Sequence, residues 1–527
     1  MSLFSQIGMY LRFARGLKKF FGEPIGLEQS RQIIKQRLEN RDRNLLTIVK
    51  KAIYDNEKSP YLELLRLAGC EYGDFERMVR CDGVEPTLGK LCQQGVCVSI
   101  EEFKGKKAIV RGSSVFELKE SDFDNPFLSQ YFEARSGASR SAGTRTIYDL
   151  DFMTQLAVYY QVLLDANDAL RFPFSLWFPI LPGGGLLAML IFTKGGKAPA
   201  KWFSQVDKRS AKPSLKSRLA TDYIVYMGIV FGAKWPKPEY VALDDSWTVA
   251  KWIAKTLKEW QGCCMETYVS AAVRICQVAR ERGLDIEGAK FFVGGEPITQ
   301  AKRKEIEAVG ATVFSDYFFT EGGWVGGSCP NSIEDDVHLF KDSLAVIQHG
   351  REVIHAGAEV NAFLFTSLLP SAPKILLNVE SGDYGLIETR SCGCKLDVLG
   401  FTDHISNIRG FDKLTGEGMT FVSTDLVKII EQVLPAIFGG ASTDYQIMEE
   451  EDEQGYTRVN LVVSPTLGAI DEAKLIQTVL SELGKGKDTQ RMMAEVWSQA
   501  NTLQVKRAQP FATARGKLLP LHIQKRK

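Results

Sequence analysis

Apolar residues recur at helical spacing through most of the first quarter of the chain. Residues 28–54 form one long periodic stretch, and residues 59–70 (SPYLELLRLAGC) end on a glycine stop signal. We therefore expect residues 28–130 to be mainly helical.

Residues 2–21 have a separate pattern, in which apolar side chains from Leu3 to Phe21 repeat every three or four positions. The polar face is basic: its charged residues are Arg12, Arg15, Lys18 and Lys19. This pattern predicts a basic amphipathic helix. It packs on the body of the protein or lies on a membrane surface, which would make the protein peripheral to a membrane.

From residue 147 to about 400, helical and strand-like segments alternate. The stretch 269–284 is followed by the strand-like KFFVGG (290–295), and 301–310 by ATVFSDYFF (311–319). This alternation predicts an α/β domain with a substantial parallel sheet, whose ligands lie beyond the carboxyl ends of the strands. The apolar run 174–192 contains two prolines and three consecutive glycines, so we interpret it as two buried strands, or a strand and the start of a helix.

The pattern changes near residue 400, where a polar, glycine-rich stretch is followed by shorter elements. We expect a helix at 429–437, a hairpin around EDEQG (451–455) and a helix at 471–484. The predicted fold is thus α/β, with a large N-terminal domain (1–402, helical over 1–130) of mixed sheets and helices. A smaller α+β domain (403–527) follows.

Composition narrows the class of protein. Lys and Arg (65) nearly balance Asp and Glu (64) in 527 residues, so no global charge favours nucleic acid, and we expect no nucleic-acid partner. Ten cysteines without dense spacing, and no apolar signal segment, predict a cytoplasmic chain with reduced thiols. Five histidines and no G-x-S-x-G motif disfavour hydrolase chemistry.

One polar stretch calls for a chemical explanation. Residues 135–146 read RSGASRSAGTRT, with three Ser, two Gly, two Thr and three Arg and no apolar periodicity. Open backbone N–H groups and hydroxyls in such a loop suit an anion such as phosphate. A flexible linker is the alternative from this stretch alone.

Three further polar stretches come after strand-like text. They are GGEP (294–297), YFFTE (317–321) and SGDYG (381–385). With the loop at 135–146 and a Gly-Lys pair at 516–517, their order and spacing resemble those of the adenylate-forming superfamily of acyl-CoA synthetases, over nearly all of residues 130–527. The phenylacetate-CoA ligase branch is the more similar, and it is also similar to the acyl-protein synthetases of fatty-aldehyde pathways.

The resemblance implies an ATP site. The loop residues that would cradle the phosphates are Ser136, Gly137, Ser139, Ser141, Gly143, Thr144 and Arg145. This loop is about three residues longer than the family pattern, and Arg145 stands where a lysine is usual. Gly295, Glu296 and Pro297 match the turn that lines adenine.

The second motif supplies further roles by resemblance. Tyr317 would stack on adenine, Thr320 would help to hold phosphate, and the Glu321 carboxylate would bind Mg²⁺, a cation that prefers oxygen ligands. Asp383 would take both ribose hydroxyls. Phe318 stands where the family usually has glycine, so the local backbone should differ.

The resemblance also assigns moving parts. Asp403 would be the hinge between the two domains, and Lys517 would be the mobile lysine that enters the site during adenylation. Phe401 occupies a position where an ATP-contacting arginine is common, and Arg409 would replace it.

Two clusters are open to more than one interpretation. Residues 194–218 carry eight basic residues and one acid, which makes them a solvated loop or a landing place for CoA phosphates or an acidic carrier protein. Cys329, His338, Cys392 and Cys394 are buried thiols or, as some phenylacetate-CoA ligase relatives imply, ligands of a structural Zn²⁺.

The predicted activity is therefore ATP-dependent activation of a carboxylic acid, aryl or fatty acyl, through an acyl-adenylate, followed by transfer to CoA. Delivery to a carrier protein or to a cysteine of a partner enzyme is the first alternative. A nucleotide-binding protein without catalysis is the second.

Overall fold

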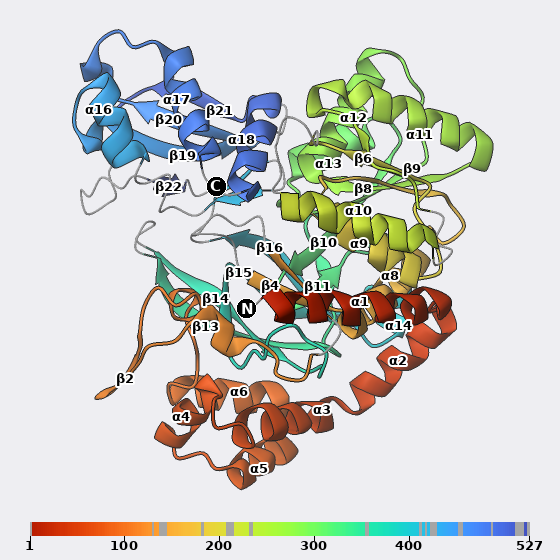
Figure 1. Cartoon of the computed structure of the whole chain (residues 1–527), viewed down its shortest axis with the longest axis vertical. Helices are drawn as coiled ribbons and strands as arrows, with labels where there is room; N and C mark the ends of the chain where they lie inside the picture. The colour runs from red at the N-terminus through yellow and green to blue at the C-terminus, as the bar shows by residue number, and fades with distance from the viewer. Residues whose placement is uncertain are drawn as a thin grey trace.

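In the part of the chain that the computed structural model describes, two sheets have more than two strands, and helices surround them (Figure 1). The described residues are 3–128, 131–135, 145–180, 184–206, 215–230, 235–353, 358–410, 414–416, 419–421, 429–451, 457–485, 488–511 and 521–523.

The larger sheet has twelve strands. In spatial order these are β13 (Leu344–Val353), β14 (Ala358–Ser367), β15 (Val379–Thr389), β16 (Asp403–Gly410), β12 (Val337–Leu339), β11 (Gly323–Gly327), β10 (Thr312–Phe319), β9 (Ala289–Gly294), β8 (Cys263–Tyr268), β5 (Phe174–Trp177), β6 (Lys201–Ser204) and β7 (Glu239–Tyr240). From β10 to β7 the neighbours are parallel, and from β13 to β10 they are antiparallel. The mixed α/β fold is as predicted.

Helices cover both faces of the parallel half, as its strongly apolar strands require. One face packs against α8 (Leu150–Ala166) and α9 (Gly185–Lys194). The other packs against α11 (Ser246–Trp260), α12 (Val269–Glu281) and α13 (Gln300–Glu307). The alternation of α12, β9, α13 and β10 is confirmed, and the apolar run 174–192 contains a strand and the start of a helix.

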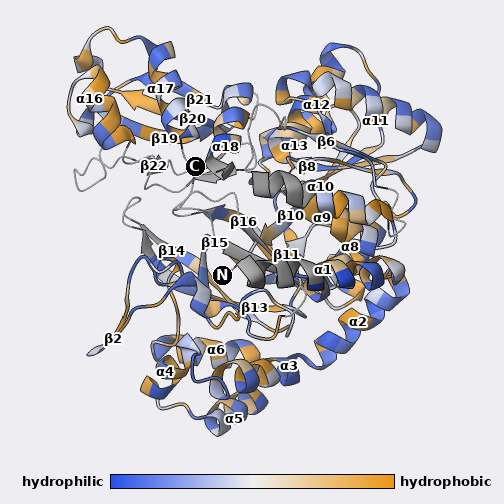
Figure 2. Ribbon diagram, viewed as in Figure 1, coloured by the Kyte–Doolittle hydropathy of each residue, from blue (hydrophilic) through white to orange (hydrophobic). Residues whose placement is uncertain are grey.

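The N-terminal part is mainly helical from Leu27 to Phe103, and from Leu45 onward it packs against the antiparallel half of the sheet. Its helices are α2 (Leu27–Glu39), α3 (Arg41–Ile48), a π-helix (Val49–Tyr54), α4 (Pro60–Leu67), α5 (Tyr72–Asp82), α6 (Val84–Gln93) and α7 (Ile100–Phe103), followed by the hairpin of β1 (Ile109–Arg111) and β2 (Ser114–Phe116). Figure 2 shows the contrast between the polar surface of α2 and the apolar α9, which is buried.

Helix α1 (Leu3–Gly22) forms as the sequence predicts, and the second half of its apolar face packs on the protein itself. Phe13, Leu17 and Phe20 are buried in the cluster formed with α8 and α9. Lys194 Nζ donates hydrogen bonds to the carbonyls of Phe20 and Glu23 at the end of this helix. In the described part of the chain, no helix is long and apolar enough to cross a membrane.

The C-terminal part has a four-stranded sheet of its own, in the order β21 (Leu503–Arg507), β20 (Thr457–Val463), β19 (Tyr445–Glu451) and β22 (Leu521–Ile523). Strands β19 and β20 form the predicted hairpin, and α17 (Glu472–Gly484) is the predicted helix. Residues 429–438 form a π-helical turn (Ile429–Val433) and α16 (Leu434–Phe438). Helix α18 (Asp488–Ala500) also packs here and was not predicted.

The strand that begins at Asp403 changes one detail of the predicted organisation. Strand β16 lies inside the twelve-stranded sheet, between β15 and β12, because it is hydrogen-bonded on both sides. Residues 403–410 therefore belong structurally with the N-terminal part, and not with the small sheet. Division into two domains that pivot at Asp403 stays a prediction.

Candidate functional site

The predicted adenine turn follows β9. Gly295 has a φ of +78°, a left-handed conformation that favours glycine. The Glu296 carboxylate accepts a hydrogen bond from Ser270 Oγ, and Lys302 Nζ lies 3.6 Å from its Oε2 atom. Glu296 thus ties the turn that ends in Pro297 to helices α12 and α13, a structural role that fixes the shape of the turn.

Tyr317 and Asp383 meet although they lie 66 positions apart in the sequence. The Tyr317 hydroxyl donates a hydrogen bond of 2.9 Å to Asp383 Oδ2. Burial and the nearby Asp383 carboxylate raise the pKa of Tyr317 well above its ordinary value, so the phenol keeps its proton. Tyr317 also lies one strand from the Gly295 turn, because β9 and β10 are parallel neighbours. The GGEP and YFFTE motifs therefore lie side by side, and the YFFTE motif contacts the SGDYG motif through Tyr317.

Thr320 and Glu321 lie in the turn between β10 and β11. Lys104, which follows the short helix α7, places its Nζ 2.6 Å from Glu321 Oε1, and both side chains are 13% exposed. Burial by itself would raise the pKa of Glu321, but the Lys104 ammonium outweighs it and lowers that pKa. The carboxylate is thus ionised, as a Mg²⁺ ligand must be, and it already has a cationic partner that the sequence motifs did not indicate.

The two remaining phosphate-binding predictions lie largely outside the described residues. Strands β3 (Tyr131–Arg135) and β4 (Arg145–Asp149) pair antiparallel, with Arg135 opposite Arg145. The loop residues between these strands, 136–144, and Lys517 lie outside the described part of the chain, as does the side chain of Arg145. Their roles stay predictions.

The two aromatic departures from the family pattern have structural explanations. Phe401 is fully buried, packs on Phe340 at a ring-centroid distance of 5.1 Å, and accepts a hydrogen bond at its carbonyl from His338 Nδ1. Phe318 packs edge-on to Trp324, and the pairing register of β10 with β11 shifts between Tyr317 and Phe318. The local backbone is therefore irregular, as expected where a bulky residue replaces glycine.

Arg409 and Asp403 both have partners within the large sheet. Arg409 Nη1 donates a 2.6 Å hydrogen bond to Asp335 Oδ2, so the guanidinium that would replace the missing arginine is engaged. Asp403 accepts hydrogen bonds from Lys341 Nζ at 3.0 Å and from Thr389 Oγ1 at 2.6 Å.

The predicted zinc ligands form one cluster. The ligand atoms of Cys329, His338, Cys392 and Cys394 all lie within 4.8 Å of one another. His338 Nε2 is 3.3 Å from the sulfurs of Cys329 and Cys394 and 3.5 Å from that of Cys392. Because His338 Nδ1 bonds the carbonyl of Phe401, the lone pair of Nε2 is free to point at the three sulfurs.

This cluster has the dimensions of a tetrahedral zinc site. With Zn–S bonds of about 2.3 Å, neighbouring sulfurs in a tetrahedron lie about 3.8 Å apart. The sulfurs of Cys329 and Cys392 are 3.8 Å apart. Three thiols and an imidazole are a donor set that suits Zn²⁺, and the Phe401 carbonyl fixes the orientation of the imidazole. The residues present therefore fit the metal.

The basic segment 194–218 is less available than its composition suggests. Lys194 is buried against backbone carbonyls, and Lys197 Nζ donates to the carbonyls of Leu170 and Phe172. Lys201 pairs with Glu239. These three lysines stabilise the fold, and residues 207–214 lie outside the described part of the chain.

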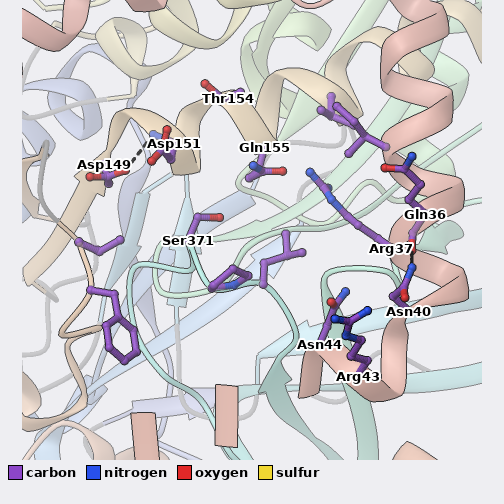
Figure 3. A pocket seen from close by; sticks show the side chains of 16 residues that line it. Gln36, Arg37, Asn40, Arg43, Asn44, Asp149, Asp151, Thr154, Gln155 and Ser371 are labelled. Carbon is purple, nitrogen blue, oxygen red and sulfur yellow. Dashed lines mark hydrogen bonds between the residues drawn. The ribbon is translucent and has the colours of Figure 1, made fainter. Parts of the chain in front are cut away.

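A cavity of about 700 Å³ lies between helices α2, α3 and α8 (Figure 3). Its polar lining includes Arg37, Asn40, Asp149, Thr154 and Gln155. It contains none of the predicted nucleotide, magnesium or zinc residues, and is a separate feature of the N-terminal part.

Comparisons with known proteins agree with this fold. No family model and no curated protein sequence matches the chain. Among solved structures, it is similar to 2-hydroxyisobutyryl-CoA ligase in complex with 2-HIB-AMP and CoA in the thioesterification state. That match has a TM-score of 0.50 and 13% identity, and covers 95% of this chain and 91% of that chain.

Two more solved structures are similar at lower scores. One is a malonyl-CoA ligase ternary product complex (TM-score 0.41, 11% identity, 72% of this chain and 71% of that chain). The other is o-succinylbenzoate CoA synthetase from Bacillus subtilis (TM-score 0.40, 12% identity, 78% and 72%). At these identities the first match shows the fold alone: the chain folds as a CoA ligase does.

Proposed function

We propose that the protein is an ATP-dependent, AMP-forming acid–thiol ligase of the adenylate-forming superfamily, in or near its phenylacetate-CoA ligase branch. The fold of a CoA ligase supports this proposal, together with the order of five sequence motifs. The reaction has two steps. A carboxylate oxygen attacks the α-phosphorus of ATP and releases pyrophosphate, and a thiol then displaces AMP from the acyl-adenylate.

The contact between Tyr317 and Asp383 is the observation that carries the proposal. It joins Tyr317, the residue that would stack on adenine, to Asp383, the residue that would hold the ribose. Tyr317 lies on the strand next to the one that ends at the Gly295 turn. An acceptor with two oxygens suits two vicinal hydroxyls. In this assignment Asp383 orients the ribose, and the Tyr317 hydroxyl holds Asp383 in place.

Charge neutralisation is the main catalytic requirement of the first step. Mg²⁺ held by Glu321 would supply it at the phosphates, since a hard cation prefers carboxylate and phosphate oxygens. Lys104 forms an ion pair with Glu321 in the structure. On binding, Mg²⁺ would replace Lys104 as the partner of this carboxylate. The loop 136–144, Thr320 and Arg145 are assigned to the phosphates, and Lys517 to the bridge between acid and nucleotide.

The exchange of labelled pyrophosphate into ATP tests the proposal directly. We expect exchange that depends on an added carboxylic acid and on Mg²⁺. Asp383→Asn should raise the KM for ATP by at least tenfold, since a hydrogen bond to a charged group is worth about 1.5–3 kcal/mol. Glu388→Asn, which removes another acid of the same strand, is the matched control. Acid-independent ATP binding with no exchange across a broad acid panel would reject the proposal.

The thiol acceptor is the next question. CoA is our first choice, and a carrier protein or a cysteine of a partner enzyme is the second. Incubation of the enzyme, ATP and an accepted acid with CoA or with carrier proteins identifies the acceptor by the thioester that forms. A thioester on protein alone would favour the second choice.

Two observations favour a second function, nucleotide binding without catalysis. Phe401 is fully buried at a position where an ATP-contacting arginine is common in the family. The Glu321 carboxylate is already paired with Lys104. Equilibrium binding of ATP, measured beside the exchange assay, separates the two functions. Binding with exchange supports the ligase, and binding alone supports the second function.

We further propose a structural zinc at Cys329, His338, Cys392 and Cys394. When bound, Zn²⁺ would cross-link the segment after β11 to the residues just before β16. Metal analysis of the purified protein should find about one zinc per chain. Cys394→Ser should lose it, whereas Cys81→Ser, at an exposed thiol far from the cluster in sequence, should keep it.

A further inference from the structure

Lys104 and Glu321 form an ion pair in the candidate nucleotide site. The Lys104 Nζ atom lies 2.6 Å from Glu321 Oε1, and each side chain is only 13% exposed. Among the described residues, no other carboxylate pairs with Lys104. The two groups are therefore a largely buried cation and anion that neutralise each other, and only Glu321 belongs to a sequence motif.

A hydrogen bond to the strand of Asp383 holds the segment that carries Lys104. The buried Glu380 carboxylate accepts a 3.1 Å hydrogen bond from the backbone N–H of Ile100, the first residue of α7. Glu380 lies on β15, three residues before Asp383. Helix α7 ends at Phe103, and Lys104 follows it directly. One short helix therefore links Lys104 to the strand that would hold the ribose.

A second buried lysine lies beside the pair but has partners of its own. Lys374 Nζ lies 5.7 Å from the centre of the Phe103 ring, and Lys104 Nζ lies 5.5 Å from the same centre. Lys374 is bound by Asp124 Oδ1 at 2.9 Å and by a backbone carbonyl at 3.0 Å. A divalent ion at Glu321 would therefore displace Lys104, whose partner it takes, and would leave Lys374 in place.

The displaced ammonium would need another anion. Lys104 is largely buried, and a buried charge that loses its partner is strongly destabilising. Mg²⁺ is usually held by one or two carboxylates together with substrate phosphates, at about 2.0–2.1 Å from each oxygen. A metal on Glu321 therefore brings a phosphate close to the carboxylate that Lys104 contacts, and this phosphate is the anion within reach.

Resting on the proposed function, we infer that Lys104 is a further phosphate-binding residue, which exchanges Glu321 for a phosphate oxygen of ATP when Glu321 takes the metal. In the adenylation step the bond between the α-phosphorus and the bridging oxygen breaks, and its electron pair leaves with pyrophosphate. The Lys104 ammonium neutralises part of that charge. The exchange also couples the two ligands, because Lys104 competes with the metal alone and assists the metal that arrives with nucleotide.

Lys104→Met should change metal binding and nucleotide binding in opposite directions. It removes the competitor for Glu321, so Mn²⁺ alone, followed by the electron paramagnetic resonance of the free ion, should bind roughly tenfold more tightly than to the wild type. It also removes a phosphate contact, so calorimetry should show ATP with Mg²⁺ binding roughly tenfold more weakly. In buffer without Mg²⁺, where Lys104 stays on Glu321, the affinity for ATP should stay within about threefold of the wild type.

Three further variants complete the test. Lys107→Met, at an exposed lysine of the same segment, is the matched control and should leave all three affinities unchanged. Lys104→Arg keeps the charge and should restore most of the affinity for ATP with Mg²⁺. Glu321→Gln frees Lys104 from its carboxylate, so ATP without Mg²⁺ should bind roughly tenfold more tightly than to the wild type. This last variant decides the question if Lys104→Met does not fold.

The outcomes separate the inference from the proposed function. If Lys104→Met left Mn²⁺ binding unchanged, or weakened ATP binding equally with and without Mg²⁺, Lys104 would be a structural residue and the inference would be wrong. An unchanged affinity of Glu321→Gln for ATP without Mg²⁺ would also overturn it. In these cases pyrophosphate exchange by the wild type would still support the ligase. A wild type that binds no ATP would overturn both.

Discussion

At the scale of single residues, the contact between Lys104 and Glu321 decides how a cation reaches the candidate site. Both side chains are largely buried, and the ammonium keeps the Glu321 carboxylate ionised. A divalent ion that binds Glu321 therefore replaces the Lys104 ammonium as its partner. The carboxylate is already ionised, so binding does not have to pay for its ionisation in an apolar setting.

The same ion pair gives a stability prediction. Lys104→Met leaves a buried carboxylate without its partner, and we expect the free energy of unfolding to fall by about 2–4 kcal/mol at pH 7.5. Urea unfolding followed by circular dichroism measures the change. Lys107→Met, at an exposed lysine three residues away, should change it by less than about 0.5 kcal/mol. Equal losses for the two variants would show that the ion pair does not matter.

Asp316 predicts a dependence of stability on pH. Burial raises its pKa to about 8 in the folded protein, whereas that of an unfolded aspartate is about 3.9, so the folded state binds the extra proton between these values. The stability contribution of Asp316 is therefore fully present below about pH 4 and is lost as the pH rises towards 8.

Asp316→Asn removes this titration. Relative to the wild type, the free energy of unfolding of the variant should rise steadily between pH 5 and pH 8. Only the wild type has a protonated Asp316 whose stabilising effect is lost over this range. Thermal melts at half-unit pH intervals measure the trend, and Asp244→Asn at an exposed position is the control. A constant difference between variant and wild type would contradict the burial of this carboxyl.

At the scale of elements, helix α1 illustrates how the fold resolves an ambiguous pattern. Its basic, amphipathic sequence suits either a membrane surface or the body of the protein. The structure buries Phe13, Leu17 and Phe20 against α8 and α9. That part of its apolar stripe is therefore not available to lipid while the helix stays docked.

We accordingly expect Leu17→Ala to lower the free energy of unfolding by about 2–5 kcal/mol, as buried leucine truncations do. Lys18→Ala, on the exposed face next to it, should have almost no effect. Denaturant unfolding compares the two. If Leu17→Ala were neutral and the wild type floated with anionic vesicles, the membrane alternative would be correct.

Local patterns predicted the elements well, and contacts distant in sequence less well. The alternation of α12, β9, α13 and β10 follows from the spacing of apolar residues, which is a local property. The place of β16 between β15 and β12 depends on pairing partners that no local pattern records. For this reason the sequence places a domain boundary at Asp403, whereas the strand that begins there is paired within the large sheet.

The candidate site divides in the same way. Motif order indicated Tyr317 and Asp383, and the structure brings them into contact. Lys104 lies 217 positions from Glu321, directly after a short helix and outside every motif, so only the folded chain reveals it. Lys197 shows the converse, since its charge suggested an anion site and its ammonium group instead binds backbone carbonyls.

At the scale of the whole molecule, one apolar cluster spans both sheets. It contains Val249 and Phe291 of the parallel half together with Tyr445 and Trp497 of the C-terminal part. The backbone N–H of Leu243 also donates to a side chain of α18. The C-terminal part is thus packed by a shared core against segments that cover the large sheet, such as α12 and residues 243–245, and not by a polar surface alone.

Trp497→Ala tests this coupling. The ring is 1% exposed, and its removal should lower the free energy of unfolding by about 3–5 kcal/mol. In scanning calorimetry we expect one transition shifted to lower temperature, because the two parts share the cluster. Ser498→Ala is the exposed control on the same helix. A new low-temperature peak beside an unchanged main peak would mean that the C-terminal part unfolds independently.

The contact between Tyr317 and Asp383 has a geometric consequence for the large sheet. Strands β10 and β15 are four places apart in the strand order, so in a flat sheet they would be separated by about 19 Å. Their side chains are nevertheless joined by a 2.9 Å hydrogen bond. The antiparallel half must therefore curve towards β10, and the hydrogen bond joins the two strands across this curve. A nucleotide bound beside this hydrogen bond would contact both β10 and β15. Its affinity would therefore depend on the curvature of the sheet as much as on either side chain.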